Sequence, residues 1–226
     1  MRVAVVRHHQ EDSAGFIAAA FGARGAELST VLFPTEGPLP GLGGLAHIVV
    51  LGSTSSVYDD GAARDWIAAE LAWLQRADAA GIPVLGICFG AQMLAEAFGG
   101  AVRPAGRQEI GWVMVDPVDP EMIPPGPWLE FHHDLCLPPD QARVLARNDF
   151  GVQAFCLGRH LAVQFHPEVD GDQFRLWLEA GGRAQIRAAG HDPDELLART
   201  IAEEPGAAAR ADRLVASALA IAAGGR

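Results

Sequence analysis

The sequence predicts an α/β protein in which a mostly parallel sheet is flanked by helices. Short apolar runs alternate with helical segments over the first hundred residues, which is the pattern of βαβ units. One of these runs, residues 84–87, follows Pro83 and ends at Cys88 inside a Gly-x-Cys-x-Gly turn. Since parallel strands end at one edge of a sheet, we expect the functional groups to gather at that edge.

Strands and helices mostly alternate through the first half of the chain. We predict buried strands over 2–7, 27–33, 46–51 and 84–87, and helices over 13–24, 62–80 and 91–98. The Pro- and Gly-rich segment 34–44 is a loop. In the helix over 62–80, one apolar face carries Trp66, Ile67, Leu71 and Leu74.

After residue 100, the sequence pattern changes from alternating strands and helices to a series of short strand-like pieces. Short strand-like pieces at 111–115, 128–131, 142–147, 152–157 and 161–165 predict a mixed or antiparallel extension of the sheet. Helices are then expected over 171–180, 184–189, 192–203 and 207–222, with Asp192 as the N-cap of the third and Pro193 at its first position. We therefore expect a main domain over 1–180 and a C-terminal helical extension over 181–226 packed on it.

The length, net charge and cysteine content of the chain argue against several classes of function. A chain of 226 residues suits one α/β domain, and its net charge of −11 argues against nucleic acid or an anionic membrane surface as a partner. No apolar run is long enough to span a bilayer, and the N-terminus is charged too early for a signal peptide. Three cysteines cannot all pair, which favours a reducing, cytoplasmic location.

Cys88 is the candidate nucleophile. Its place between a strand and a helix forces a tight turn, and Gly86 and Gly90 leave room for the backbone to make it. The helix N-terminus favours the thiolate form of the cysteine. The alternative is an ordinary strand-loop-helix connection.

His166 and Glu168 are the candidate base and its orienting group. They follow an apolar strand, lie two residues apart on one face of an extended chain, and enclose a proline that disfavours helix. A surface turn is the alternative. The backbone N–H of Phe89 and the turn at Gly52-Ser53 are candidate donors to a developing oxyanion.

These motifs together resemble the class I, triad-type glutamine amidotransferase family. The resemblance is carried by residues 86–92 (GICFGAQ) and 164–168 (QFHPE). Residues 50–53 (VLGS), 56–60 (SVYDD) and 109–112 (EIGW) follow in the expected order the pattern of stand-alone proteins similar to the glutaminase domain of GMP synthase.

The resemblance implies a flavodoxin-like core and a γ-glutamyl thioester on Cys88, formed with release of ammonia and then hydrolysed. It implies that His166 is the base, that Glu168 is the third member of the triad, and that Gly52 and Phe89 occupy the oxyanion positions. The residues expected around the substrate are Gln92, Ser53, His132, His133 and Asp134.

Two departures from the family pattern bear on the substrate. Gly52-Ser53 stands where the family usually has two glycines, and residues 131–134 (FHHD) stand where it has Ser-His-Gly-Asp. The bulk of His133 and the lost hydroxyl at Phe131 predict weak binding of free glutamine. A γ-glutamyl peptidase or transferase with the same triad is therefore the main alternative, and a non-catalytic regulatory module is a second.

No cofactor or metal is expected. The chain has no phosphate-binding loop of the Gly-x-x-x-x-Gly-Lys-[Ser/Thr] type, so a separate ammonia-accepting synthetase subunit is a possible partner. The pair His8-His9 is interpreted as a loop or substrate-edge contact, because no ligand spacing supports a metal. Cys136 and Cys156 are expected to be inert core thiols, and Trp66, Trp73 and Trp177 are expected to pack in the core.

Overall fold

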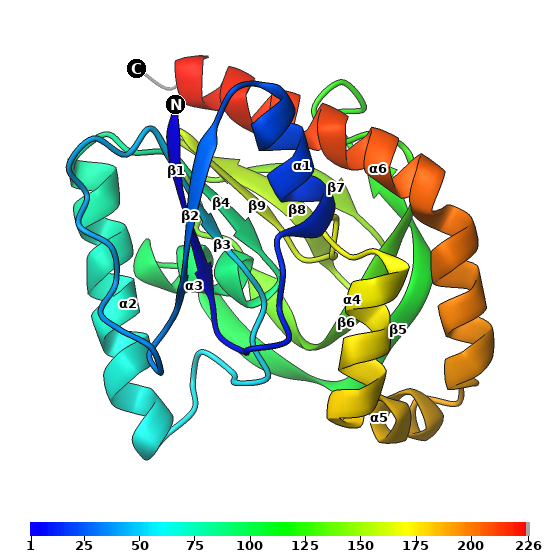
Figure 1. The fold of residues 1–226 in the computed structure, drawn as a ribbon. Coiled ribbons are helices and arrows are strands. Elements are labelled where there is room, and N and C mark those ends of the chain that lie inside the picture. Colours follow the sequence, from blue (N-terminus) through cyan, green and yellow to red (C-terminus); the bar gives the residue numbers. More distant parts are fainter. Residues whose placement is uncertain (225–226) are drawn as a thin grey trace.

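The fold is built on one mixed sheet of nine strands with helices on both of its faces (Figure 1). It was obtained as a computed structural model and is described for residues 1–224. The strands are β1 Arg2–Arg7, β2 Glu27–Leu32, β3 His47–Val50, β4 Val84–Ile87, β5 Ala101–Pro117, β6 Gly126–Leu137, β7 Arg143–Arg147, β8 Val152–Leu157 and β9 His160–Val163.

Five neighbouring strands form the parallel half of the sheet. They lie in the order β2-β1-β3-β4-β9 and all their pairings are parallel. This is the 2-1-3-4-5 order of flavodoxin-like folds, with β9 as the fifth strand. The predicted fold class is confirmed, and the first four strands lie where the apolar runs predicted them, within a residue at each end.

The other half of the sheet is antiparallel and extends in the order β9-β8-β7-β5-β6. The two short pieces predicted at 111–115 and 128–131 are parts of much longer strands: the first lies near the end of β5 and the second near the start of β6. The prediction was too short because both strands continue through polar residues, such as Arg103 and Glu109, whose backbone groups still pair across the hairpin.

Alternating strand residues divide the core into two layers. Val3, Val49 and Leu85 face a layer that contains side chains of α1 (Gly15–Ala23) and α6 (Pro193–Gly224). Their neighbours Ala4 and Ile48 face the opposite layer, built with α2 (Ala62–Ala79) and α3 (Phe89–Ala97). A third cluster lies between the β5–β6 hairpin and the helices α4 (Gly171–Trp177), α5 (Arg183–Ala188) and α6.

The C-terminal helices differ from the prediction. In place of helices over 192–203 and 207–222, one helix, α6, runs along the edge of the molecule and contains Pro205 (Figure 1). Its buried stripe continues on both sides of the proline, through Thr200, Ala207 and Ala211, so packing holds the two halves together. The predicted cap is confirmed, because Asp192 Oδ1 accepts the backbone N–H groups of Asp194 and Glu195.

The segment between α4 and α5, Leu178–Gly182, is a wide helical turn with a kink at Gly181, whose φ is 115°.

Within residues 1–224, no helix is both long enough and apolar enough to cross a membrane.

Candidate active site

Cys88 lies at a strained elbow between β4 and α3. Its φ of 51° and ψ of −107° make it the only non-glycine residue with positive φ among those the structure describes. A Cβ atom at position 86 would lie 2.4 Å from the Gly90 carbonyl oxygen, and one at position 90 would lie 2.2 Å from the Val50 carbonyl oxygen. Both glycines are therefore required for the turn that presents the thiol, as the sequence predicted.

His166 and Glu168 follow β9 and are joined by a hydrogen bond of 2.8 Å between Nδ1 and Oε1. Both side chains are buried. Burial opposes a charge on the imidazole, yet the Glu168 carboxylate and the neighbouring Cys88 raise the pKa of His166 well above its ordinary value. The pair is anchored through the backbone, since His166 N–H donates to the Leu129 carbonyl and Phe16 N–H to the Glu168 carbonyl.

Cys88 and His166 open into the same cavity of about 530 Å³. It lies at the carboxyl ends of β1, β3, β4 and β9, where the parallel strands were expected to place the functional groups. The cavity is also lined from β6 and from the kinked segment after α4. Its lining residues are His9, Glu11, Asp12, Gly52, Ser53, Thr54, Cys88, Phe131, His166, Trp177, Ala180, Gly181, Gly182 and Gln185.

Two backbone N–H groups, that of Phe89 and that of Ser53 in the Gly52–Ser53 turn, are candidate oxyanion donors, whereas the family resemblance implied Gly52 in place of Ser53. Those of Ser53 and Phe89 donate to no protein acceptor within the described chain. A Cβ at position 52 would lie 3.1 Å from Cε1 of His166, so Gly52 packs directly against the imidazole. Ser53 does not have a positive φ, which explains how serine is accommodated where the family usually has a second glycine.

Four of the expected substrate-binding residues do not line the cavity. Gln92 is buried and donates to Gln164 Oε1 at 3.2 Å. Asp134 is buried and accepts hydrogen bonds of 2.6 Å from Ser56 Oγ and Tyr58 Oη. The His133 side chain is half exposed beside Asp134.

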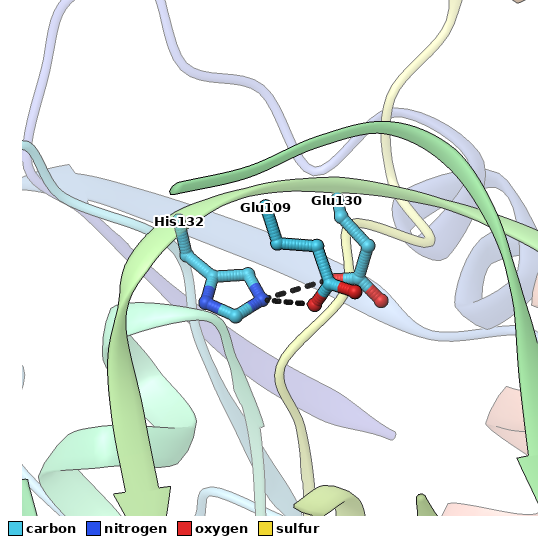
Figure 2. Close-up of side chains that lie close together, drawn as sticks. All are labelled: Glu109, Glu130 and His132. Carbon is cyan, nitrogen blue, oxygen red and sulfur yellow. Dashed lines mark hydrogen bonds and ion pairs between the residues drawn. The ribbon is translucent and has the colours of Figure 1, made fainter. Parts of the chain in front are cut away.

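The fourth, His132, belongs to a buried cluster in the β5–β6 hairpin. Its Nε2 faces Glu109 Oε2 at 3.0 Å and Glu130 Oε2 at 3.2 Å, and Figure 2 shows the imidazole pointing at both carboxylates. Its Nδ1–H donates to the Asp134 carbonyl at 3.1 Å. Although burial opposes the charge, Glu109 and Glu130 raise the pKa of His132 to about 10. The arrangement is that of an imidazolium beside the Glu109 carboxylate and Glu130, and burial raises the pKa of Glu130 to about 7.

The same cluster is the candidate metal-binding group within residues 1–224, because one ligand atom from each residue lies within 4.8 Å of the others. The carboxylate oxygens of Glu109 are already bonded by the side-chain amides of Asn148 and Gln153, at 2.7 and 2.9 Å. These bonds and the protonated His132 make a self-contained ionic cluster, and the absence of a metal stays a prediction.

Sequence reasoning missed part of the cavity wall. Trp177 packs against the third core cluster as predicted, but it is only partly buried and also lines the cavity. Its ring lies edge-on to His166 at 4.9 Å, and its Nε1–H donates to Asp12 Oδ1 at 3.0 Å. A tryptophan on a helical face carries no signal that separates these roles. Trp73, Cys136 and Cys156 are buried as predicted, and burial raises the pKa of Cys136 to about 12.

Comparison with known proteins identifies the family. The model of the family described as "Glutamine amidotransferase class-I" matches residues 15–179, which include the elbow, His166 and Glu168. The chain belongs to the class I glutamine amidotransferase family. The solved glutamine amidotransferase from Thermotoga maritima has the same fold with a TM-score of 0.87 and 25% identity, covering 97% of this chain and 98% of that one.

Curated proteins similar to this chain include GMP synthases. The glutamine-hydrolysing GMP synthase of Thermus thermophilus is 30% identical over 78% of this chain, but the match covers 36% of that protein. A glutamine-hydrolysing GMP synthase subunit of Sulfolobus acidocaldarius is 37% identical over 39% of this chain and 52% of its own length. The matches thus span about half or less of these relatives.

Proposed function

We propose that the chain hydrolyses a γ-carboxamide of the glutamine type through a Cys88–His166–Glu168 triad. The observation that carries the proposal is the shared cavity: a thiol on a strained elbow and an imidazole opposite it, with the other imidazole nitrogen held by a buried carboxylate. Nucleophile, base and orienting group are the three roles that covalent acyl transfer requires.

The first half-reaction forms a thioester. Because Glu168 favours the protonated form of His166, the imidazole accepts the proton of the Cys88 thiol as the first step. The thiolate attacks the amide carbon, and the oxyanion accepts hydrogen bonds from the Ser53 and Phe89 N–H groups. His166 then gives its proton to the amide nitrogen, the C–N bond breaks, and ammonia leaves a γ-glutamyl thioester on Cys88.

The second half-reaction returns the enzyme to its starting state. His166, now neutral, takes a proton from water, and the hydroxide attacks the thioester carbon. The C–S bond breaks, glutamate is released, and the thiolate faces the imidazolium again. Glu168 keeps the imidazole oriented throughout by its hydrogen bond to Nδ1.

A second candidate substrate is a larger γ-glutamyl compound. The cavity volume of about 530 Å³ lies in the range of roughly 300–1,000 Å³ typical for drug-sized ligands, which leaves space beyond a glutamine side chain. Phe131 and Trp177 give part of this space an aromatic wall. A γ-glutamyl peptide or γ-glutamyl amine would occupy it.

A synthetase partner is the third part of the proposal. The Sulfolobus relative is by name one subunit of a GMP synthase, which indicates that a glutamine-hydrolysing chain can work beside a separate partner chain. We propose that the ammonia is passed to such a partner if the isolated chain turns over slowly.

The test compares glutamate release from glutamine and from a series of γ-glutamyl peptides, with Cys88→Ala as the control. Turnover of glutamine supports the amidotransferase reaction, and turnover of peptides alone supports the second candidate. If neither class reacts and neither leaves a thioester that hydroxylamine can capture on Cys88, the proposal is wrong.

A further inference from the structure

A second buried ion pair lies directly behind the proposed oxyanion site. His8, which follows β1, places Nε2 at 3.0 Å from Glu70 Oε2 on α2, and its Nδ1 at 2.9 Å from the Gly52 carbonyl oxygen. Glu70 is fully buried and His8 nearly so. An acidic residue on the core face of a helix is rare unless it has a defined partner.

The two partners fix the protons of His8. A carbonyl oxygen can only accept, so Nδ1 carries a proton and donates it to Gly52. Nε2 lies within hydrogen-bond distance of Glu70, whose contact favours a second proton on the ring and therefore the imidazolium form. The rings of Phe89 and Trp66 lie at 5.0 and 5.4 Å and prevent the imidazole from turning. Burial opposes this charge, but Glu70 and, more weakly, Asp12 raise the pKa of His8.

The hydrogen bond to Gly52 determines the direction of the next N–H group. The Gly52–Ser53 peptide is trans, so its C=O and N–H point in opposite directions. Because the carbonyl is bound by His8 on one side, the Ser53 N–H is directed to the other side, where Ser53 and Cys88 line the same cavity. A charged donor on the carbonyl also polarises the peptide and strengthens the N–H as a donor.

We propose that His8 and Glu70 are positioning residues for the oxyanion hole: the imidazolium, oriented by Glu70, holds the Gly52 carbonyl so that the Ser53 N–H faces the reacting carbonyl oxygen. This inference rests on the proposed function. Neither residue lines the cavity, so the pair does not touch the substrate. His8 affects catalysis only through the Gly52–Ser53 peptide.

The test uses His8→Gln and Glu70→Gln, with His47→Gln as the matched control. His47 is also a buried histidine, but it lies at the first residue of β3, far along the strand from Gly52. With the γ-glutamyl substrate that the wild type turns over, we expect kcat to fall about 10- to 100-fold in the first two variants, with KM within about threefold. The control should keep kcat within about twofold.

Two probes separate positioning from general damage. An aldehyde analogue of glutamine forms a hemithioacetal on Cys88 whose oxygen needs the oxyanion donors, whereas iodoacetamide alkylates the thiolate without them. We expect the aldehyde to bind about 10- to 100-fold more weakly to the variants while the alkylation rate stays within about threefold. Unchanged aldehyde binding overturns the inference, and so does a parallel loss of both reactivities, which would make the pair purely structural.

Failure of the proposed function gives a different result. If the wild type neither turns over any γ-glutamyl substrate nor binds the aldehyde, the proposed function fails, and the inference is then decided by nitrogen NMR of ¹⁵N-histidine-labelled protein. The proposed geometry is supported if both ring nitrogens of His8 carry a proton at pH 7 in the wild type and if Nε2 loses its proton in Glu70→Gln. An unprotonated Nδ1 contradicts it.

Discussion

At the scale of single residues, Glu168 favours the charged form of His166, the proposed catalytic base. The buried carboxylate favours the imidazolium form and raises the pKa of His166. The proton that His166 must deliver to the leaving ammonia is therefore held to higher pH than in an isolated imidazole. The alkaline limb of the pH profile of kcat/KM should therefore depend on the contact between Glu168 and His166.

Glu168→Gln should move the alkaline limb of kcat/KM to lower pH by about one unit or more, because the pKa of His166 falls when the carboxylate charge is lost. Its kcat should drop on the order of 10²- to 10⁴-fold as the imidazole loses its fixed orientation. Glu96→Gln, an exposed change on α3, serves as the control. An alkaline limb that stays in place would contradict this role of Glu168.

The positive φ of Cys88 predicts a stability difference between two inactive variants. A non-glycine residue in this region is strained by about 1–3 kcal/mol, and glycine relieves the strain while adding about 1 kcal/mol of unfolded-state entropy. Cys88→Gly should therefore be more stable than Cys88→Ala by about 1 kcal/mol. Urea unfolding of both variants measures this. Equal or higher stability of the alanine variant would mean that the elbow is not strained.

His132 predicts a pH dependence of folding. Its pKa is about 10 in the folded protein and about 6.5 in the unfolded chain, so its stabilisation is complete below pH 6.5 and is lost as pH rises towards 10. Glu130, whose pKa is raised to about 7, titrates in the same range, so both proteins should carry Glu130→Gln. One pKa unit corresponds to about 1.4 kcal/mol, so Glu130→Gln should lose at least about 1 kcal/mol more than Glu130→Gln/His132→Gln between pH 7 and 10. Parallel stability curves for the two proteins would refute the imidazolium assignment.

At the scale of elements, the sequence predicts local structure well and pairing poorly. The strand at 2–7 and the elbow at Cys88 were found because an apolar run and two glycines are local signals. The long β5–β6 hairpin was not, because its polar residues are paired across strands rather than patterned along them. The His8–Glu70 contact joins residues 62 positions apart and leaves only one trace in the sequence, an acidic residue on a buried helical face.

Helix α6 is the element in which local and tertiary preferences disagree. Pro205 lacks the N–H of a helical hydrogen bond and is exposed, while buried residues on either side keep the helix continuous. Pro205→Ala should raise the free energy of unfolding by about 1–3 kcal/mol. Ala202→Pro, an exposed position in the same helix, should lower it by about 3 kcal/mol. Destabilisation by Pro205→Ala would show that the proline contributes to the packing of α6.

At the scale of the whole molecule, the parallel half of the sheet brings the site together. Gly52, Cys88 and His166 follow three neighbouring strands, β3, β4 and β9, and meet at one edge although 114 positions separate the first from the last. The topology of alternating units predicts this meeting, so the position of the candidate site was accessible to sequence reasoning. The far wall of the cavity comes from Phe131, Trp177 and the kink at Gly181, which depend on how the hairpin and C-terminal helices pack.

The most direct test of the triad is intact-mass analysis after treatment with a diazo-ketone analogue of glutamine. We predict one covalent adduct per chain on the wild type and none on Cys88→Ala, because only an activated thiol in a cavity that accepts glutamine reacts. This test does not require turnover, so it also applies if a partner chain controls the rate. Absence of the adduct on wild-type protein whose Cys88 still reacts with iodoacetamide would contradict the assignment of glutamine as the substrate.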